Sequence, residues 1–192
     1  MFITGNTDAD ALLNTDATAL LIGMLLDQQV PMEWAFTGPW TLRERLGHLD
    51  PALIATMPES DFVAVCCDRP AIHRFPAAMG RRIHEMCTSL VGAYPDDIES
   101  LWTRAGDAAM LYRRLRELPG FGDEKAKIFI AILAKRCNVQ PAGWREAAGS
   151  FGDDVPRSVA DIHSVESLAL VREWKKAQKA AKKDKQDRPL RS

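Results

Sequence analysis

Apolar residues recur at helical spacing along most of this chain. Two such stripes follow each other between residues 108 and 133, and a third covers residues 79–94. Residues spaced by three and four positions share one face of a helix, whereas a half-buried strand would alternate apolar and polar residues. No alternating stretch of useful length and no internal repeat is present. The pattern predicts an all-α fold. The two consecutive stripes consist of Leu111, Leu115 and Leu118, and of Ala126, Phe129, Ile130 and Leu133.

The stretch "ATALLIGMLLDQQV", residues 17–30, differs from these amphipathic segments because its centre is apolar on every side. Such a helix is buried all round. Thr15 or Asp16 precedes it and can cap its N-terminus. Its longest apolar run, residues 19–26, is too short to cross a bilayer, and the N-terminus lacks the basic start of a signal peptide. We therefore expect no membrane partner.

Length and charge bear on the number of domains and on the partners that the chain can attract. The chain of 192 residues fits one compact domain or two small lobes, and its net charge of −1 gives no general attraction to polyanions. The final stretch, residues 172–192, is an exception because it holds six Lys and three Arg against one Glu and two Asp. We expect a solvated, fraying tail there; a supplementary phosphate-binding arm is the alternative.

Four cysteines without C-x-x-C spacing indicate reduced thiols in a cytoplasmic protein. The histidines show no zinc-binding spacing. We expect no cofactor on these grounds.

The stretch "LPGFGDEKAKIF" predicts a tight turn between two helices. Pro119 fixes φ, and Gly120 and Gly122 permit positive φ and close backbone approach. The following helix begins with unpaired N–H groups and a positive dipole end, which suits a phosphate. Lys125 and Lys127 add positive charge, whereas Asp123 and Glu124 would repel a phosphate placed close to them. A plain helical corner remains the alternative.

Two motifs carry a resemblance to a known family. "LPGFGDEKA" resembles the L-P-G-x-G-x-x-x-A signature of the helix-hairpin-helix DNA glycosylases, which include endonuclease III, the adenine mismatch glycosylases and the alkylpurine glycosylases. "LLIGMLLDQQVPMEWAF" is similar to their early glutamine-containing helix. The resemblance implies a two-lobed helical fold within one domain, 1–192. One lobe spans 17–134 and ends in the hairpin at 108–133; the other combines 1–16 with 135–192.

The resemblance also implies DNA contacts. Gln28 and Gln29 would fill the space left by a flipped base and touch the opposite strand, because amides both donate and accept hydrogen bonds. The hairpin would grip the phosphate backbone of double-stranded DNA through Gly120, Phe121, Gly122, Lys125 and Lys127. Backbone carbonyls of Leu118 and Phe121 would hold a structural Na⁺ or K⁺ ion.

The family places an essential aspartate downstream of the hairpin, and "RSVADIHSVESL" offers Asp161, with Asp153 and Asp154 as rivals. Release of a base passes through a sugar cation, which a carboxylate stabilises while it orients or deprotonates water. We expect Asp161 to lie in the cleft between the lobes, with the hairpin at the cleft's edge. An N-cap role is compatible with this position.

Members with lyase activity carry a nucleophilic lysine two residues after the second glycine, where this chain has Glu124. Lys125 is one residue later, rotated by about 100° around the helix. The sequence therefore favours a monofunctional glycosylase that uses water; a bifunctional glycosylase and lyase that uses Lys125 is an alternative. No cysteine follows Cys137, so the iron–sulfur loop of endonuclease III-like members is absent.

The base pocket is the least defined part of the site. Met32, Trp34 and Trp144 are candidates to line it or stack on a base, although aromatic residues at such spacings also occupy cores.

The glutamine helix favours an altered purine as the substrate. We expect a monomer in the bacterial cytoplasm, associated with the nucleoid when bound to DNA. A non-catalytic binder of distorted DNA is the remaining alternative.

Overall fold

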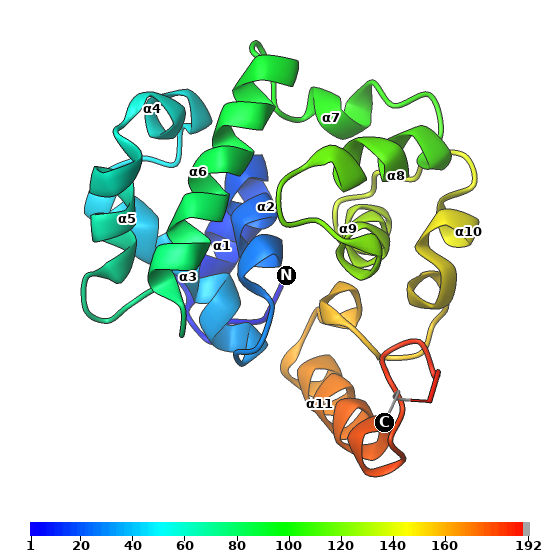
Figure 1. Ribbon diagram of the computed structural model, residues 1–192. Coiled ribbons are helices and arrows are strands. Elements are labelled where there is room, and N and C mark those ends of the chain that lie inside the picture. Colours follow the sequence, from blue (N-terminus) through cyan, green and yellow to red (C-terminus); the bar gives the residue numbers. More distant parts are fainter. Residues whose placement is uncertain (190–192) are drawn as a thin grey trace.

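The structure, a computed structural model, describes residues 1–189 (Figure 1). These residues form helices joined by short connections, and their β-structure is limited to one isolated bridge between Lys183 and Pro189. The predicted all-α class is confirmed.

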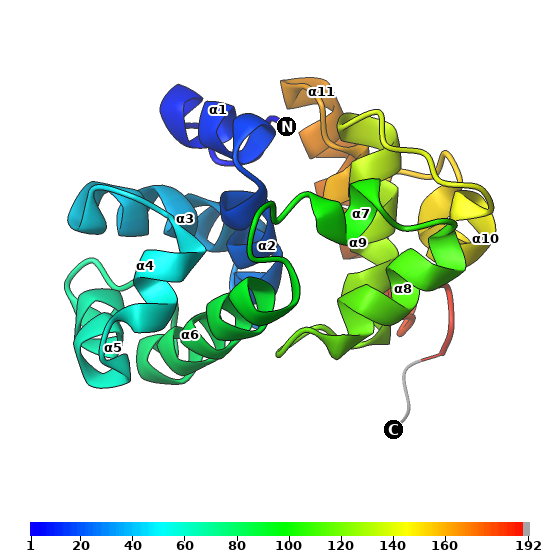
Figure 2. The same ribbon diagram turned by 90° about the horizontal axis from the view of Figure 1, so that it is seen from above.

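The helices form two groups that lie side by side (Figure 2). α2 and α9 pack on each other across the boundary between the groups, and an ion pair between Glu33 and Arg172 joins α3 to α11. The first group comprises α1 (Thr7–Thr15), α2 (Ala17–Leu26), α3 (Met32–Leu46), α4 (Pro51–Thr56), α5 (Glu59–Cys67) and α6 (Pro76–Ala93). The second comprises α7 (Ser100–Thr103), α8 (Ala108–Glu117), α9 (Asp123–Arg136), α10 (Trp144–Ala148), the 3₁₀ turns η1 (Gly149–Gly152) and η2 (Val159–Asp161), and α11 (Val165–Ala180).

This grouping differs from the lobe boundaries expected from the resemblance. α1 packs on α2 and α3, so residues 1–16 lie with the first group and not with the C-terminal helices. α8 and α9 pack on each other and on α10, and α9 also packs on η2. The division therefore falls between α6 and α7 and not at residue 134, because the hairpin buries its apolar stripes against the segment that follows it.

The central helix of the first group is α2, which is buried from Thr18 to Leu26. The Asp16 side chain accepts a hydrogen bond from the Ala19 N–H at 2.8 Å, as the sequence predicts for a cap. Among residues 1–189 no single helix is long and apolar enough to cross a membrane. Only α1 and α2 together reach that length and hydropathy, and they meet at 112°.

The two stripes of the hairpin also lie in the core, as predicted. Leu111 and Leu115 of α8 and Phe129 of α9 are fully buried. Phe121, in the turn, packs edge-on against Phe129 with ring centroids 5.8 Å apart. These contacts fix the direction in which α9 leaves the turn, and so they position the side chains of its first residues.

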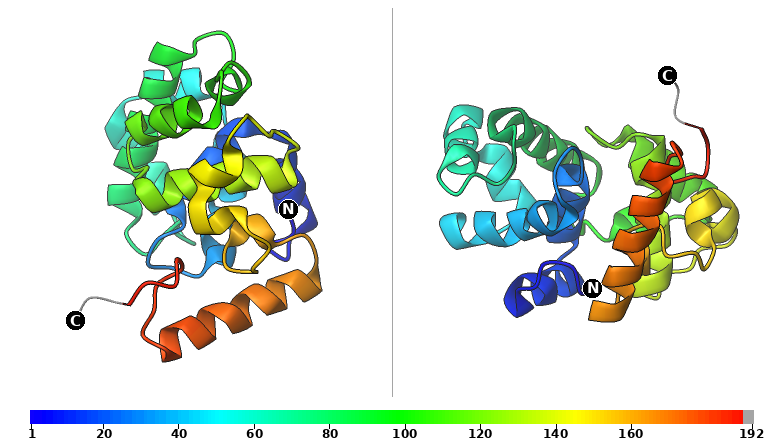
Figure 3. Two further views of the ribbon diagram at one scale, coloured as in Figure 1. Left: turned by 90° about the vertical axis from the view of Figure 1, so that its right-hand side faces the viewer. Right: turned by 90° about the horizontal axis from the view of Figure 1, so that it is seen from below.

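The expected fraying tail is wrong for residues 182–189, which fold back beside the end of α11 (Figure 3). Asp187 pairs with Arg157 at 2.9 Å, and Lys185 pairs with Glu124 of α9 at 3.3 Å. Lys185 and Asp187 have partners from distant segments, whereas Lys182, Lys183 and Arg188 are exposed, as the basic composition predicted. Residues 190–192 lie outside the described residues.

Candidate functional site

The turn of the hairpin rests on the C-terminal end of α2. The Phe121 N–H donates to the Leu118 carbonyl at 3.1 Å, and Gly120 adopts φ +83°. A Cβ atom at Gly120 would lie 3.3 Å from Leu25 Cδ1. The glycine is therefore required both by the left-handed backbone and by the close approach to α2.

Replacing Gly120 with alanine should lower the free energy of unfolding by about 1–2 kcal/mol, because a side chain is strained at positive φ and would also press on Leu25. Urea unfolding measures the change. Gly106→Ala is the matched control, since a Cβ atom at Gly106 meets nothing within 4 Å and its φ lies outside the left-handed region. Equal losses in the two variants would show that the turn has no special requirement for glycine.

The first turn of α9 presents backbone donors without interference from nearby acids. Gly122 is the N-cap residue and supplies no side-chain hydrogen bond. Asp123 accepts a hydrogen bond from Tyr112 Oη at 2.7 Å and pairs with Lys127 at 3.0 Å. Although burial raises the pKa of Asp123, these two partners lower it below its usual value. Glu124 pairs with Lys185, so each of the two acids next to the helix start has a cationic partner.

The two lysines of α9 point in different directions, since two residues along a helix correspond to about 200° of rotation. Lys127 faces α8 and pairs with Asp123, which also accepts a hydrogen bond from Tyr112. Lys125 faces α2, where its Nζ donates to the Leu25 carbonyl. Burial lowers the pKa of Lys125 to about 8, against the opposing pull of the Asp27 carboxylate.

The two predicted glutamines follow α2 and have different environments. Gln28 Nε2 donates to the Leu25 carbonyl at 3.0 Å, so it shares this acceptor with Lys125. Gln29 is exposed and adopts φ +55°. Buried His73 holds their turn: its Nε2–H donates to the Gln28 carbonyl at 2.9 Å, while its Nδ1 accepts from the Phe75 N–H.

A groove separates this turn from α11, and we call it the α2–α11 groove. Residues from both groups of helices line it, including the segment between α2 and α3, α11 and the folded-back tail. Lys125 is not one of its lining residues, but two of them, Asp27 and Lys185, act on the charge of the Lys125 amine. The lining residues are Asp27, Gln28, Gln29, Val30, Pro31, Met32, Glu33, Arg172, Lys175 and Lys185.

The structure does not bring the three base-pocket candidates together. Met32 lines the α2–α11 groove, where its Sδ accepts a hydrogen bond from Lys175 Nζ at 3.4 Å. Trp34 is exposed on α3, and its indole N–H donates to the Ala71 carbonyl. Trp144 is buried in the second group beneath the guanidinium of Arg145. Only Met32 therefore shares a surface with the glutamines.

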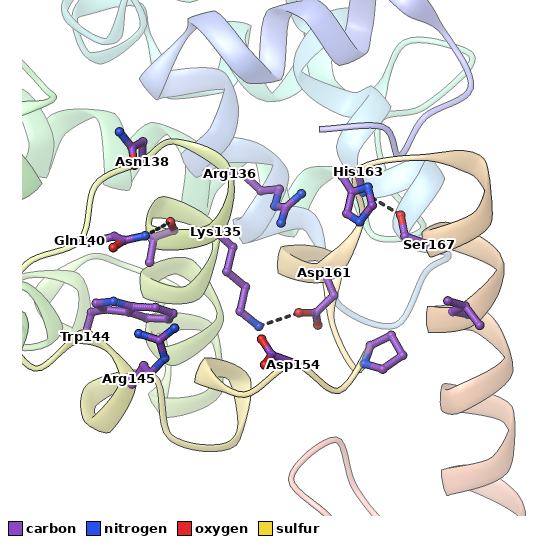
Figure 4. Close-up of a pocket in the computed structure, with 13 residues that line it drawn as sticks. Lys135, Arg136, Asn138, Gln140, Trp144, Arg145, Asp154, Asp161, His163 and Ser167 are labelled. Atoms are coloured by element: carbon purple, nitrogen blue, oxygen red, sulfur yellow. Dashed lines mark hydrogen bonds and ion pairs between the residues drawn. The ribbon is translucent and has the colours of Figure 1, made fainter.

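Asp161 lies in a separate pocket that α9, α10 and the start of α11 form (Figure 4). Its Oδ1 pairs with Lys135 Nζ at 2.7 Å. Its Oδ2 accepts hydrogen bonds from the Arg157 and Ser158 N–H groups and from Ser158 Oγ, which completes a capping box on η2. The side chains of Asp161 and Lys135 are 9% and 11% exposed. This carboxylate is therefore held in a nearly buried ion pair.

Asp161 is not beside the hairpin turn, contrary to the expectation. Its partner Lys135 follows Lys125 by ten residues, which is about 15 Å along the axis of α9. The two catalytic candidates therefore lie at opposite ends of one helix. The expectation failed because the segment 138–157 contains α10 and η1 and carries the chain to the far end of α9. A catalytic role for Asp161 stays a prediction, as it does for its exposed rivals Asp153 and Asp154.

Sequence reasoning missed three charged residues that the structure places at these sites. Asp27 and Lys175 line the α2–α11 groove, and Lys135 holds Asp161. For Asp27 a signal existed, because it is the first charged residue after a long buried run and directly precedes the glutamines. Lys175 and Lys135 look like ordinary surface lysines in the sequence, and only tertiary packing distinguishes them.

No group of three or more His, Cys, Asp or Glu side chains within residues 1–189 is arranged to hold a metal ion, and the four cysteines are free thiols. The Leu118 carbonyl, a predicted ligand of a monovalent cation, accepts the turn hydrogen bond from Phe121. A carbonyl oxygen has a second lone pair, so the cation site stays a prediction.

Neither a family model, nor a curated protein, nor a solved structure matches this chain.

Proposed function

We propose that this chain is a base-excision DNA glycosylase that hydrolyses the N-glycosidic bond of a damaged base flipped out of double-stranded DNA. One observation supports this most: the hairpin and the glutamine turn, about ninety residues apart in sequence, meet at one carbonyl. Leu25 O accepts hydrogen bonds from both Gln28 and Lys125. A phosphate-binding turn and an amide that enters the base stack must act on one duplex at the same time, so they must be adjacent.

The electrostatics of the α2–α11 groove support the same function. Arg172, Lys175 and Lys185 line it together with Gln28, Gln29 and the carboxylates of Asp27 and Glu33. Arg172 pairs with Glu33 and Lys185 with Glu124, so among residues 1–189 Lys175 is the lining cation without an ion pair. A polyanionic backbone is attracted by local positive charge even though the whole chain is nearly neutral. The bare N–H groups at the start of α9 add phosphate donors.

The wild-type protein should release a base from at least one duplex in a panel that carries methylated, deaminated or oxidised purines, with mismatched and undamaged duplexes as controls. Each abasic site is converted to a strand break by hot alkali and measured on a gel. Binding to an abasic-site duplex without base release from any lesion would instead establish a non-catalytic binder of damaged DNA.

A second candidate, a glycosylase that also has lyase activity, is supported by the Lys125 amine. Nucleophilic attack needs the neutral amine, and the lowered pKa of Lys125 supplies a larger neutral fraction at physiological pH than an exposed lysine would. The same side chain donates to the Leu25 carbonyl that also accepts from Gln28, so the amine lies next to the glutamine turn.

A further inference from the structure

Asp27 occupies a fixed position at the mouth of the α2–α11 groove. It is the C-cap residue of α2, and its N–H donates to the Gly23 carbonyl at 3.1 Å. The next residue is held by the buried His73 through the Gln28 carbonyl. Asp27 is thus anchored on both sides by buried structure, and its side chain lines the groove.

Lys175 of α11 lines the same groove as Asp27, and Lys125 of α9 lies close enough for its charge to interact with this carboxylate. Asp27 attracts the charges of Lys125 in α9 and Lys175 in α11. None of the ion pairs formed within residues 1–189, defined by an N–O separation of at most 4.0 Å, includes Asp27. The two amines donate instead to the Leu25 carbonyl and to the weak acceptor Met32 Sδ. The groove therefore leaves space between opposite charges.

Other carboxylates near the groove are engaged. Glu33 accepts a hydrogen bond from Arg172 Nε at 2.9 Å, and Glu124 pairs with Lys185 at 3.3 Å. Partly buried charges usually have direct partners in a folded protein. Asp27 departs from this rule in the groove, where the segment after α2, helix α11 and the folded-back tail converge.

We propose that Asp27 is the catalytic carboxylate of this groove, an assignment that rests on the proposed glycosylase function. Asp27 accepts a proton from the attacking water as the water oxygen bonds to C1′ of the sugar. The C1′–N bond breaks, its electron pair leaves with the base, and the base takes a proton from solvent. Asp27 then returns its proton to solvent. Lys125 and Lys175 balance the charge of Asp27 and hold the flanking phosphates.

The test uses the panel duplex from which the wild type releases its base fastest, under single-turnover conditions. Asp27→Asn should slow release by about 100-fold or more, the contribution expected of a general base. Its affinity for a duplex with a tetrahydrofuran abasic analogue should change by less than about threefold. Asp68→Asn is the matched control, because Asp68 is the exposed C-cap aspartate of α5, and it should retain the wild-type rate.

A second variant separates chemistry from folding. Asp27→Ala should regain part of its rate when formate is added, since formate supplies a carboxylate in the vacated space, and a purely structural role would not respond. An active wild type whose Asp27→Asn variant keeps more than a tenth of its rate would overturn the assignment and leave the glycosylase function standing. A wild type inactive on every duplex would overturn both.

Discussion

Asp161→Ala should lower the free energy of unfolding by about 3 kcal/mol, at the lower end of the range for breaking a buried ion pair. The substitution leaves the Lys135 ammonium, whose side chain is 11% exposed, without its charged partner. It also removes the acceptor for the Arg157 and Ser158 N–H groups. Lys135 keeps a hydrogen bond to the Asp153 carbonyl, which limits the loss. Urea unfolding followed by circular dichroism measures the change.

Two further variants test whether the broken ion pair causes the loss of stability in Asp161→Ala. Asp154→Ala should change stability by less than about 0.5 kcal/mol, because Asp154 is exposed at the rim of the same pocket. Lys135→Met combined with Asp161→Ala should recover part of the loss, since no charge is then left unpaired. If the double variant were as unstable as the sum of its single variants, the ion pair would not be the cause.

The ion pair between Asp161 and Lys135 also predicts how Asp161→Asn affects the rate of base release. The resemblance assigns Asp161 to catalysis, whereas its position indicates a structural ion pair with Lys135. Asp161→Asn should therefore keep more than a tenth of the wild-type rate of base release once the rate is divided by the folded fraction. A folded Asp161→Asn variant without activity would instead favour the catalytic role that the resemblance implies.

The sequence was sufficient where local rules decide the structure. The all-round apolar pattern predicted the burial of α2, and the glycine and proline positions predicted the turn between α8 and α9. Both follow from backbone conformation and helical periodicity, which involve neighbours along the chain. The resemblance predicted that the hairpin and the glutamine turn contact one duplex. The two turns share the Leu25 carbonyl, and the DNA-binding role stays a prediction.

The sequence was insufficient where the outcome depends on which distant charges meet. Asp161 was expected beside the hairpin, but α10 and η1 carry it to Lys135 instead. The tail was expected to fray, but Lys185 and Asp187 form ion pairs with Glu124 of α9 and with Arg157 beside η2. Ion pairs between residues far apart in sequence follow from packing, and no local pattern encodes them.

Sodium borohydride should trap the wild-type protein on a lesion-containing duplex, and Lys125→Met should abolish the adduct, if the second candidate function is right. The amine bonds to C1′ as the bond to the base breaks, and the opened sugar becomes an imine that borohydride reduces to a stable amine. Lys127→Met is the matched control, because Lys127 faces α8 and Asp123. Base release without any adduct would leave water as the sole nucleophile.

The pH dependence of Lys125 gives a second measurement that does not require a substrate. Its folded pKa of about 8 lies below the usual lysine pKa of 10.5, so folding disfavours the protonated amine. This destabilisation is fully present below about pH 8 and is relieved as the pH rises towards 10.5, because the unfolded chain binds more protons in that interval. The free energy of unfolding of the wild type should therefore rise relative to that of Lys125→Met between these values.

The charged groups around Lys125 determine how borohydride trapping should depend on pH. Burial favours the neutral amine, Arg82 of α6 and Lys185 of the tail reinforce it, and Asp27 opposes it. Adduct formation should increase up to about pH 8 and then level off, well below the range expected of an exposed lysine. Asp27→Asn removes the opposing charge, so it should move the plateau to lower pH. A plateau near 10.5 in both proteins would show that the amine is solvated and not poised for attack.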